Sequence, residues 1–218
     1  MDKISFIQIA DPLVPACITA GSHKTPVWIQ SEWTEGEFSQ YIRRNGCGHC
    51  CAAMAARLRG KDIDPYQEYL LCRELWGEPN IQKQQDHFLT VAGIQKILTH
   101  LGISARCHGV AKNEQKQAVT HILSSLQAGK LVIFVSDPFR DTDNIFSTGY
   151  HYVMAVGFAE NGKIVIANSS EKISKGGVQL VAPEKIENAL YQGGTADENM
   201  TWGIVEQLDN GCTYVVVD

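Results

Sequence analysis

The spacing of hydrophobic positions changes between the two halves of the chain. In the first half, apolar residues recur at helical spacing, which predicts helices over 47–58, 65–76, 90–101 and 113–129. In the second half, short apolar runs bounded by turn residues predict strands over 131–137, 151–158, 163–168, 178–181, 200–208 and 212–218, with a helix over 183–191. Two more strands are predicted at 27–30 and 103–110. Helices followed by an antiparallel sheet indicate the α+β class.

The segment 45–58, NGCGHCCAAMAARL, places a cysteine at the start of one of these helices. Asn45 and Gly46 form a turn, and the run of Ala, Met, Arg and Leu after Cys47 is strongly helix-forming. The unpaired amides and the positive dipole end of a helix favour a thiolate over a thiol. We therefore expect an acidic, reactive thiol at Cys47, presented by a buried helix.

This cysteine-rich segment has three interpretations when taken alone. The sequence CGHC at 47–50 is a C-x-x-C motif at a helix start, which is typical of disulfide isomerases. Alternatively, Cys47 is a single nucleophile that needs a histidine from elsewhere in the chain. The third interpretation is a helix whose cysteines are small apolar core residues. A zinc site built from 47–51 is disfavoured, because it crowds four ligands into five residues and lacks a distant second ligand pair.

A candidate base for Cys47 lies in the second half of the chain. His151 begins a strand, and the next strand returns through a hairpin at 160–162 and ends at Asn168. Counting outward from the hairpin places His151 and Asn168 near the same end of the ribbon. An amide oxygen there can accept a hydrogen bond from one imidazole nitrogen and leave the other nitrogen for the sulfur. Taken singly, each residue also fits an ordinary position in a strand or a turn.

Cysteine at a helix start, histidine on a strand and asparagine at the end of the next strand follow the chain order of papain-like cysteine peptidases. The chain resembles the papain-like peptidases related to the bacteriocin-processing (double-glycine) peptidase family. The motifs that carry the resemblance are VWIQ at 27–30, GCG at 46–48, AAM at 52–54, YHYVMAVGF at 150–158 and KIVIAN at 163–168. The resemblance covers residues 27–170 or thereabouts.

The resemblance implies a papain-like fold, in which N-terminal helices that include the nucleophile helix pack on a C-terminal antiparallel sheet. It also implies roles for single residues: Cys47 as nucleophile, His151 as general base and Asn168 as the residue that orients the base. Gln30 matches the side-chain donor of the oxyanion hole, and Gln40 is the reserve because the intervening loop is long. The expected substrate is a peptide or protein, cleaved through a thioester acyl-enzyme, and no cofactor or metal is implied.

The sequence departs from the family pattern at three places. His49 and Cys50 stand where relatives usually have Pro-Thr or Pro-Ala. Tyr150 replaces a glycine before the histidine, and Asn168 falls where most relatives have aspartate. Three alternatives to peptide hydrolysis stay open: acyl transfer or deamidation on the same triad, thiol–disulfide exchange at CGHC, and a binding module without catalysis. The polar approach to Cys47 disfavours exchange, because thioredoxin-like domains run a strand directly into C-x-x-C.

Composition limits the class of partner and the compartment. The 218 residues have a net charge of −5 and a pI near 5.8, which argues against nucleic acid or an anionic membrane as the main partner. No apolar run is long enough to span a bilayer and no signal peptide is visible, so a cytoplasmic location is expected. Seven cysteines, an odd number, indicate free thiols in a reducing compartment. Without a linker or repeat, a single domain over 1–218 is expected.

Overall fold

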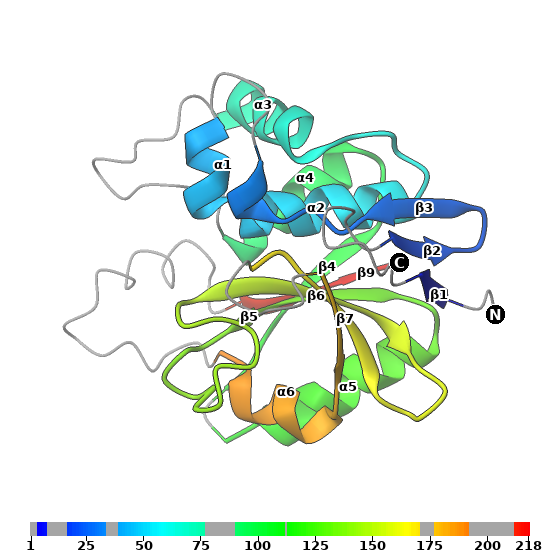
Figure 1. Ribbon diagram of the computed structural model, residues 1–218, viewed down its shortest axis with the longest axis vertical. Coiled ribbons are helices and arrows are strands. Elements are labelled where there is room, and N and C mark those ends of the chain that lie inside the picture. Colours follow the sequence, from blue (N-terminus) through cyan, green and yellow to red (C-terminus); the bar gives the residue numbers. More distant parts are fainter. Residues whose placement is uncertain are drawn as a thin grey trace.

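The computed structural model describes residues 4–7, 17–33, 39–76, 90–111, 113–170, 177–191 and 212–218 (Figure 1). Over these residues a six-stranded antiparallel sheet lies between two layers of helices, and a three-stranded antiparallel sheet lies near the N-terminus. The small sheet contains, in order, β1 (Ile4–Ile7), β2 (Cys17–Ala20) and β3 (His23–Pro26). Helices packed on an antiparallel sheet confirm the predicted α+β class.

The large sheet has the strand order β4-β9-β5-β6-β7-β8. Its strands are β4 (Ala105–Gly109), β5 (Leu131–Ser136), β6 (His151–Phe158), β7 (Ile164–Asn168), β8 (Gly177–Val181) and β9 (Cys212–Val217). Every residue of β5 and β7 is buried, and so is every residue of β6 except its last. Helices on both faces therefore explain why these strands read as continuous apolar runs rather than as an alternating pattern.

The helices divide between the two faces of this sheet (Figure 1). One face carries α1 (Ser39–Asn45), α2 (Cys47–Leu58), α3 (Pro65–Trp76) and α4 (Val91–His100), and the other carries α5 (Gln115–Gln127) and α6 (Pro183–Ala189). Side chains of β6 alternate between the faces: Tyr152 and Met154 join the core beneath α2, whereas Val153 and Ala155 join the core beneath α5 and α6. No helix in the described part of the chain is long and apolar enough to cross a membrane.

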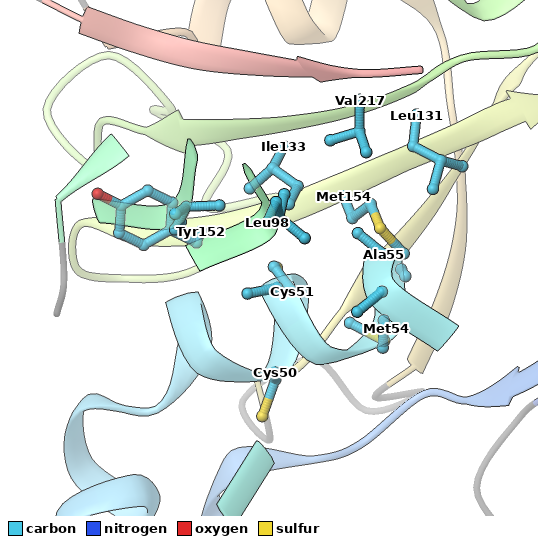
Figure 2. Packing of buried hydrophobic residues seen from close by; sticks show 14 of the residues in the cluster. Cys50, Cys51, Met54, Ala55, Leu98, Leu131, Ile133, Tyr152, Met154 and Val217 are labelled. Atoms are coloured by element: carbon cyan, nitrogen blue, oxygen red, sulfur yellow. The ribbon is translucent and has the colours of Figure 1, made fainter. Parts of the chain in front are cut away.

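Helix α2 is the central helix of its layer, enclosed by the sheet on one side and by α3 and α4 on the others. Ten of its residues are buried, and four of them are alanines, whose small side chains let the helix lie close to β6. Figure 2 shows Cys51 and Ala55 on the side of α2 that faces the sheet, with Ala55 near Met154, whereas the sulfur of Cys50 points away from the sheet. The nucleophile predicted at the start of α2 is thus carried by a rigid, enclosed element.

The helices predicted over 47–58, 65–76, 90–101, 113–129 and 183–191 are confirmed to within two residues at each end. Thr90 caps α4 as its position suggests, because its hydroxyl accepts a hydrogen bond from the Gly93 amide at 2.9 Å. The strand predicted over 200–208 lies outside the described residues. The expectation of a single domain stays a prediction.

Two predictions near the nucleophile are wrong. The strand expected over 27–30 is absent, because β3 ends at Pro26 and a 3-10 turn, Gln30–Glu32, follows. The segment before Cys47, expected to be a polar turn, ends in helix α1 (Ser39–Asn45). This helix is stabilised by tertiary packing, since its Tyr41 and Ile42 are buried in the core while most of its sequence is polar.

Candidate active site

Cys47 lies at a tight junction between two helices. Helix α1 ends at Asn45, α2 begins at Cys47, and Gly46 alone separates them. A Cβ atom on Gly46 would lie 2.3 Å from the carbonyl oxygen of Ile42, which also accepts the Gly46 amide at 2.7 Å. A side chain at this position would therefore collide with the backbone of α1. The close contact fixes the angle between the end of α1 and the start of α2, and therefore the position of Cys47.

The sulfur of Cys47 lies against the backbone of β6. Burial raises the pKa of this thiol, and the backbone N–H groups of Tyr152, Gly48 and Cys47 itself lower it by less. The acidic thiol expected from the helix-start position is therefore wrong for this structure. The physical reason is that burial disfavours the thiolate by more than the backbone N–H groups near the helix start favour it.

His151 and Asn168 are hydrogen-bonded partners on neighbouring strands. His151 Nε2 lies 2.8 Å from Asn168 Oδ1. His151 is the first residue of β6 and Asn168 the last of β7, and Asn168 pairs with Val153, two residues beyond the histidine. Both side chains consequently lie on the same face at the same end of the ribbon. This is the position that counting from the hairpin predicts.

The imidazole of His151 is buried, with 4% of the residue exposed. Burial lowers its pKa to about 4, and the hydrogen bond to Asn168 offsets this only in part. The ring is therefore neutral at neutral pH. The sulfur of Cys47 and the imidazole do not hydrogen-bond each other in this structure; the sulfur lies instead at the amide of Tyr152, the residue after His151.

Gln30 contacts both the chain next to Asn168 and helix α1, which precedes Cys47. Its backbone amide donates to the carbonyl oxygen of Ser169, next to Asn168, at 3.1 Å. Its side-chain Nε2 makes a long contact of 3.5 Å with the carbonyl oxygen of Arg43, in the last turn of the helix before Cys47. Its Oε1 is buried and has no hydrogen-bond partner. The side chain of Gln40, the reserve candidate, lies outside the described part.

The histidine of the CGHC motif belongs to a second, buried cluster. His49 Nδ1 is hydrogen-bonded to Glu68 Oε2 of α3, and Cys72 Sγ donates to Glu68 Oε1 at 3.3 Å. All three residues are buried, and the rings of Tyr41 and Tyr69 pack edge-on to the imidazole at centroid distances of 5.8 and 5.5 Å. The cluster joins the first turn of α2 to α3, directly beside the nucleophile.

The same cluster is the place in the described chain where a metal ion could be held. One donor atom from each of His49, Glu68 and Cys72 lies within 4.8 Å of the others. A closed structural zinc site uses four ligands, and both oxygens of Glu68 already take part in hydrogen bonds to the other two residues. These three residues are thus one ligand short of a closed structural zinc site.

Sequence reasoning assigned no role to Glu68, although the sequence contains a signal for it. In the helix over 65–76, Glu68 lies beside Tyr69 and one turn before Cys72, on the stripe that the apolar pattern assigns to the core. A carboxylate on a buried stripe needs a partner, because an unpaired buried charge is strongly unfavourable. The pattern could have predicted a buried partner for Glu68, but not that it is His49.

The geometry of the remaining cysteines argues against thiol–disulfide exchange. Cys50 and Cys51 have no exposed surface, and burial raises the pKa of both thiols well above the usual range. Exchange begins with attack by the thiolate of the first cysteine of the motif, and burial raises the pKa of the Cys47 thiol as well. All seven cysteines are free in the structure.

Two solved structures are among those to which this chain is similar. The peptidase domain of Streptococcus ComA, described as a bi-functional ABC transporter involved in a quorum-sensing pathway, is 13% identical over 80% of this chain and 90% of its own, with a TM-score of 0.44. A Bacillus anthracis protein described as a C39-like peptidase is 14% identical over 80% of this chain and 88% of its own, with a TM-score of 0.47. No curated protein matches the sequence.

The family assignment rests on a match to most of the chain. The model of the Peptidase_C39 like family matches residues 25–194, a range that contains the Cys47 helix and the strands of His151 and Asn168. The match extends beyond the part of the chain covered by the motifs, because it includes β8 and α6. The chain belongs to the Peptidase_C39 like family and is a papain-like cysteine peptidase.

Proposed function

We propose that this peptidase cleaves peptide bonds with Cys47 as nucleophile, His151 as general base and Asn168 as the residue that orients the base. The observation that carries the proposal is the hydrogen bond of 2.8 Å between His151 Nε2 and Asn168 Oδ1. With its proton on Nε2, the neutral imidazole has a lone pair on Nδ1 that can accept the thiol proton. Catalytic hydrogen bonds are often long or poorly aligned before substrate binds, and the sulfur of Cys47 and the imidazole of His151 are expected to form theirs in the substrate complex.

The two half-reactions balance without an added reagent. In the first, Sγ attacks the substrate carbonyl carbon while its proton passes to Nδ1, and the C–N bond breaks as that proton passes to the leaving amine. In the second, water attacks the thioester, gives a proton to Nδ1, and the C–S bond breaks as the sulfur takes this proton back. The products are a carboxylic acid and an amine, and the thiol and the neutral imidazole are regenerated.

The negative oxygen of each tetrahedral intermediate needs hydrogen-bond donors. In the proposal these are the backbone amide of Cys47, at the start of α2, and the side-chain amide of Gln30. Gln30 Nε2 is held only by the long contact with Arg43, so it can turn toward an oxyanion without losing a strong hydrogen bond. The hydrogen bond from its backbone amide to Ser169 keeps Gln30 in place while the side chain rotates.

Replacing Gln30 with alanine is expected to lower kcat by about 10²-fold, because one oxyanion donor is lost. KM is expected to change little, since the oxyanion exists only in the tetrahedral intermediates and transition states. Steady-state kinetics on a peptide substrate measures both. Gln40→Ala is the matched variant: if it loses activity while Gln30→Ala does not, Gln40 supplies the donor.

The pKa values of the two reacting groups predict the pH dependence. His151 acts as a base only when neutral, and its pKa of about 4 means that kcat/KM falls only as the pH drops through about 4. Burial raises the pKa of the Cys47 thiol, so its alkylation by iodoacetamide near pH 6 is expected to be no faster than that of a simple exposed thiol. Rapid alkylation of Cys47 near pH 6 would contradict this and indicate a preformed thiolate.

Acyl transfer and deamidation would use the same acyl-enzyme with a different acceptor or leaving group. A peptide library incubated with the protein and read by mass spectrometry separates the three reactions. Hydrolysis divides a peptide into two shorter ones that sum to its mass plus one water. Acyl transfer joins an acyl segment to a second amine, and deamidation changes a side-chain amide to an acid without breaking the backbone.

A further inference from the structure

The amide of Asn168 makes four hydrogen bonds, and one of them is to a side chain that the reaction does not require. Oδ1 accepts from His151 Nε2 at 2.8 Å and from the backbone amide of Ser170 at 2.8 Å. Nδ2 donates to the carbonyl oxygen of Phe146 at 3.0 Å and to Gln179 Oε1 at 3.2 Å. Every hydrogen-bonding position of this amide is therefore occupied.

Backbone groups fix the direction of each bond in this chain. The amide of Ser170 can only donate, so the atom that faces it is Oδ1 of Asn168. The carbonyl of Phe146 can only accept, so the atom that faces it is Nδ2. Because Oδ1 is an acceptor, His151 Nε2 has to be the donor, and the lone pair of the neutral ring lies on Nδ1.

The orientation of the Gln179 side-chain amide is likewise fixed by a backbone group. Its Nε2 donates to the carbonyl oxygen of Ile145 at 3.1 Å, and this backbone acceptor turns Oε1 of Gln179 toward Asn168. Gln179 lies on β8, paired with Ile166 of β7, and bridges that strand to the loop before β6. Asp141 steadies the loop, because its carboxylate accepts the amide of Phe146 at 2.9 Å.

We propose that Gln179 is a positioning residue that holds the Asn168 amide in the orientation required for His151 to act as a base through Nδ1. The proposal rests on the proposed function of His151 and Asn168. If the Asn168 amide turned over, Nδ2 would face the Nε2–H of His151, and the ring would move its proton to Nδ1, where it blocks acceptance of the thiol proton. The backbone groups of Ser170 and Phe146 oppose this turn, and Gln179 adds to them, since its Oε1 would then face the oxygen of Asn168.

The test compares Gln179→Met, which has similar length and no hydrogen-bonding amide, with Gln179→Glu, which keeps an oxygen for Asn168. Leu180→Met on the same strand is the matched control, because its side chain is 40% exposed and lies outside the cluster. Loss of one buried hydrogen bond is expected to lower kcat by about tenfold in Gln179→Met, with KM unchanged. Gln179→Glu keeps an oxygen for Asn168 but loses the donor to the Ile145 carbonyl, so it is expected to recover part of that loss. Leu180→Met is expected to behave as wild type.

Nitrogen-15 NMR of the histidine rings gives a readout that does not depend on activity. The wild type is expected to carry its His151 proton on Nε2, and Gln179→Met is expected to populate the Nδ1–H form. If Gln179→Met keeps the Nε2–H form and wild-type kcat, or loses only thermal stability, the proposal is overturned. If Gln179→Met does not fold, Gln179→Glu provides the test. Wild-type kcat in Gln179→Glu, although its His151 proton has moved to Nδ1, would also overturn the proposal. Failure of the wider proposed function would appear differently, as full activity in His151→Ala.

Discussion

Cys47→Ala is expected to lower the turnover of a peptide substrate by on the order of 10⁵-fold, and His151→Ala is expected to lower it by a similar factor. The reason is that the sulfur forms the bond to the substrate and the imidazole moves every proton in both half-reactions. Because the two groups act as one unit, the double variant is expected to lose no more than either single variant. The measurement is initial rate under saturating substrate, with a peptide identified from the library digest.

Two variants control this experiment. Cys50→Ser changes the neighbouring buried thiol without touching the reacting groups, and most of the hydrolase activity is expected to remain. Asn168→Ala removes the partner of Nε2 but leaves the base, so partial activity is expected. Full activity in His151→Ala would reject the assignment of the base. Loss of activity in Cys50→Ser, combined with reduction of insulin by the wild type, would instead favour the redox interpretation of CGHC.

The parts of the site that could be predicted are those connected by short stretches of chain. His151 and Asn168 are separated by one hairpin, so counting along two strands is enough to place them at the same end. Cys47 is placed by the helix that follows it, because helix-start signals are local. The connection between the cysteine and the pair is long-range, and there the prediction relied on the resemblance to a family.

The parts that could not be predicted depend on contacts between distant segments. Burial raises the pKa of the Cys47 thiol, and the backbone amide of Tyr152, about a hundred positions away, offsets part of that rise. The 3-10 turn at Gln30 is joined to the backbone of Ser169, which no local pattern reveals. Gln179 could not be singled out either, because a polar residue in a strand is most simply a solvated one.

Family membership and the site geometry answer different parts of the functional question. The family model identifies a cysteine peptidase, and the hydrogen bonds around Asn168 indicate which imidazole nitrogen would act as the base. His49 is a departure from the family pattern, and the structure gives it a place that has nothing to do with redox chemistry. Its bond to Glu68 fixes the first turn of the nucleophile helix against α3.

This bond leads to a prediction on stability. Glu68→Ala is expected to lower the free energy of unfolding by about 3–5 kcal/mol, because it leaves His49 and Cys72 buried without their shared acceptor. Glu68→Gln is expected to lower it by less, since an amide oxygen can still accept from Cys72 and an amide N–H can donate to His49 Nδ1. Glu74→Ala is the matched control: Glu74 is exposed on the same helix, and a change within about 0.5 kcal/mol is expected.

Urea unfolding measures these differences, and the midpoint is expected to move at constant slope. A chelator added to the wild type distinguishes the hydrogen-bonded cluster from a metal site made by the same three residues. If Glu68 acts through hydrogen bonds alone, the chelator leaves the unfolding midpoint unchanged. A chelator effect as large as that of Glu68→Ala would show a bound ion instead, and equal stability of Glu68→Ala and Glu74→Ala would show that the cluster does not hold α2 against α3.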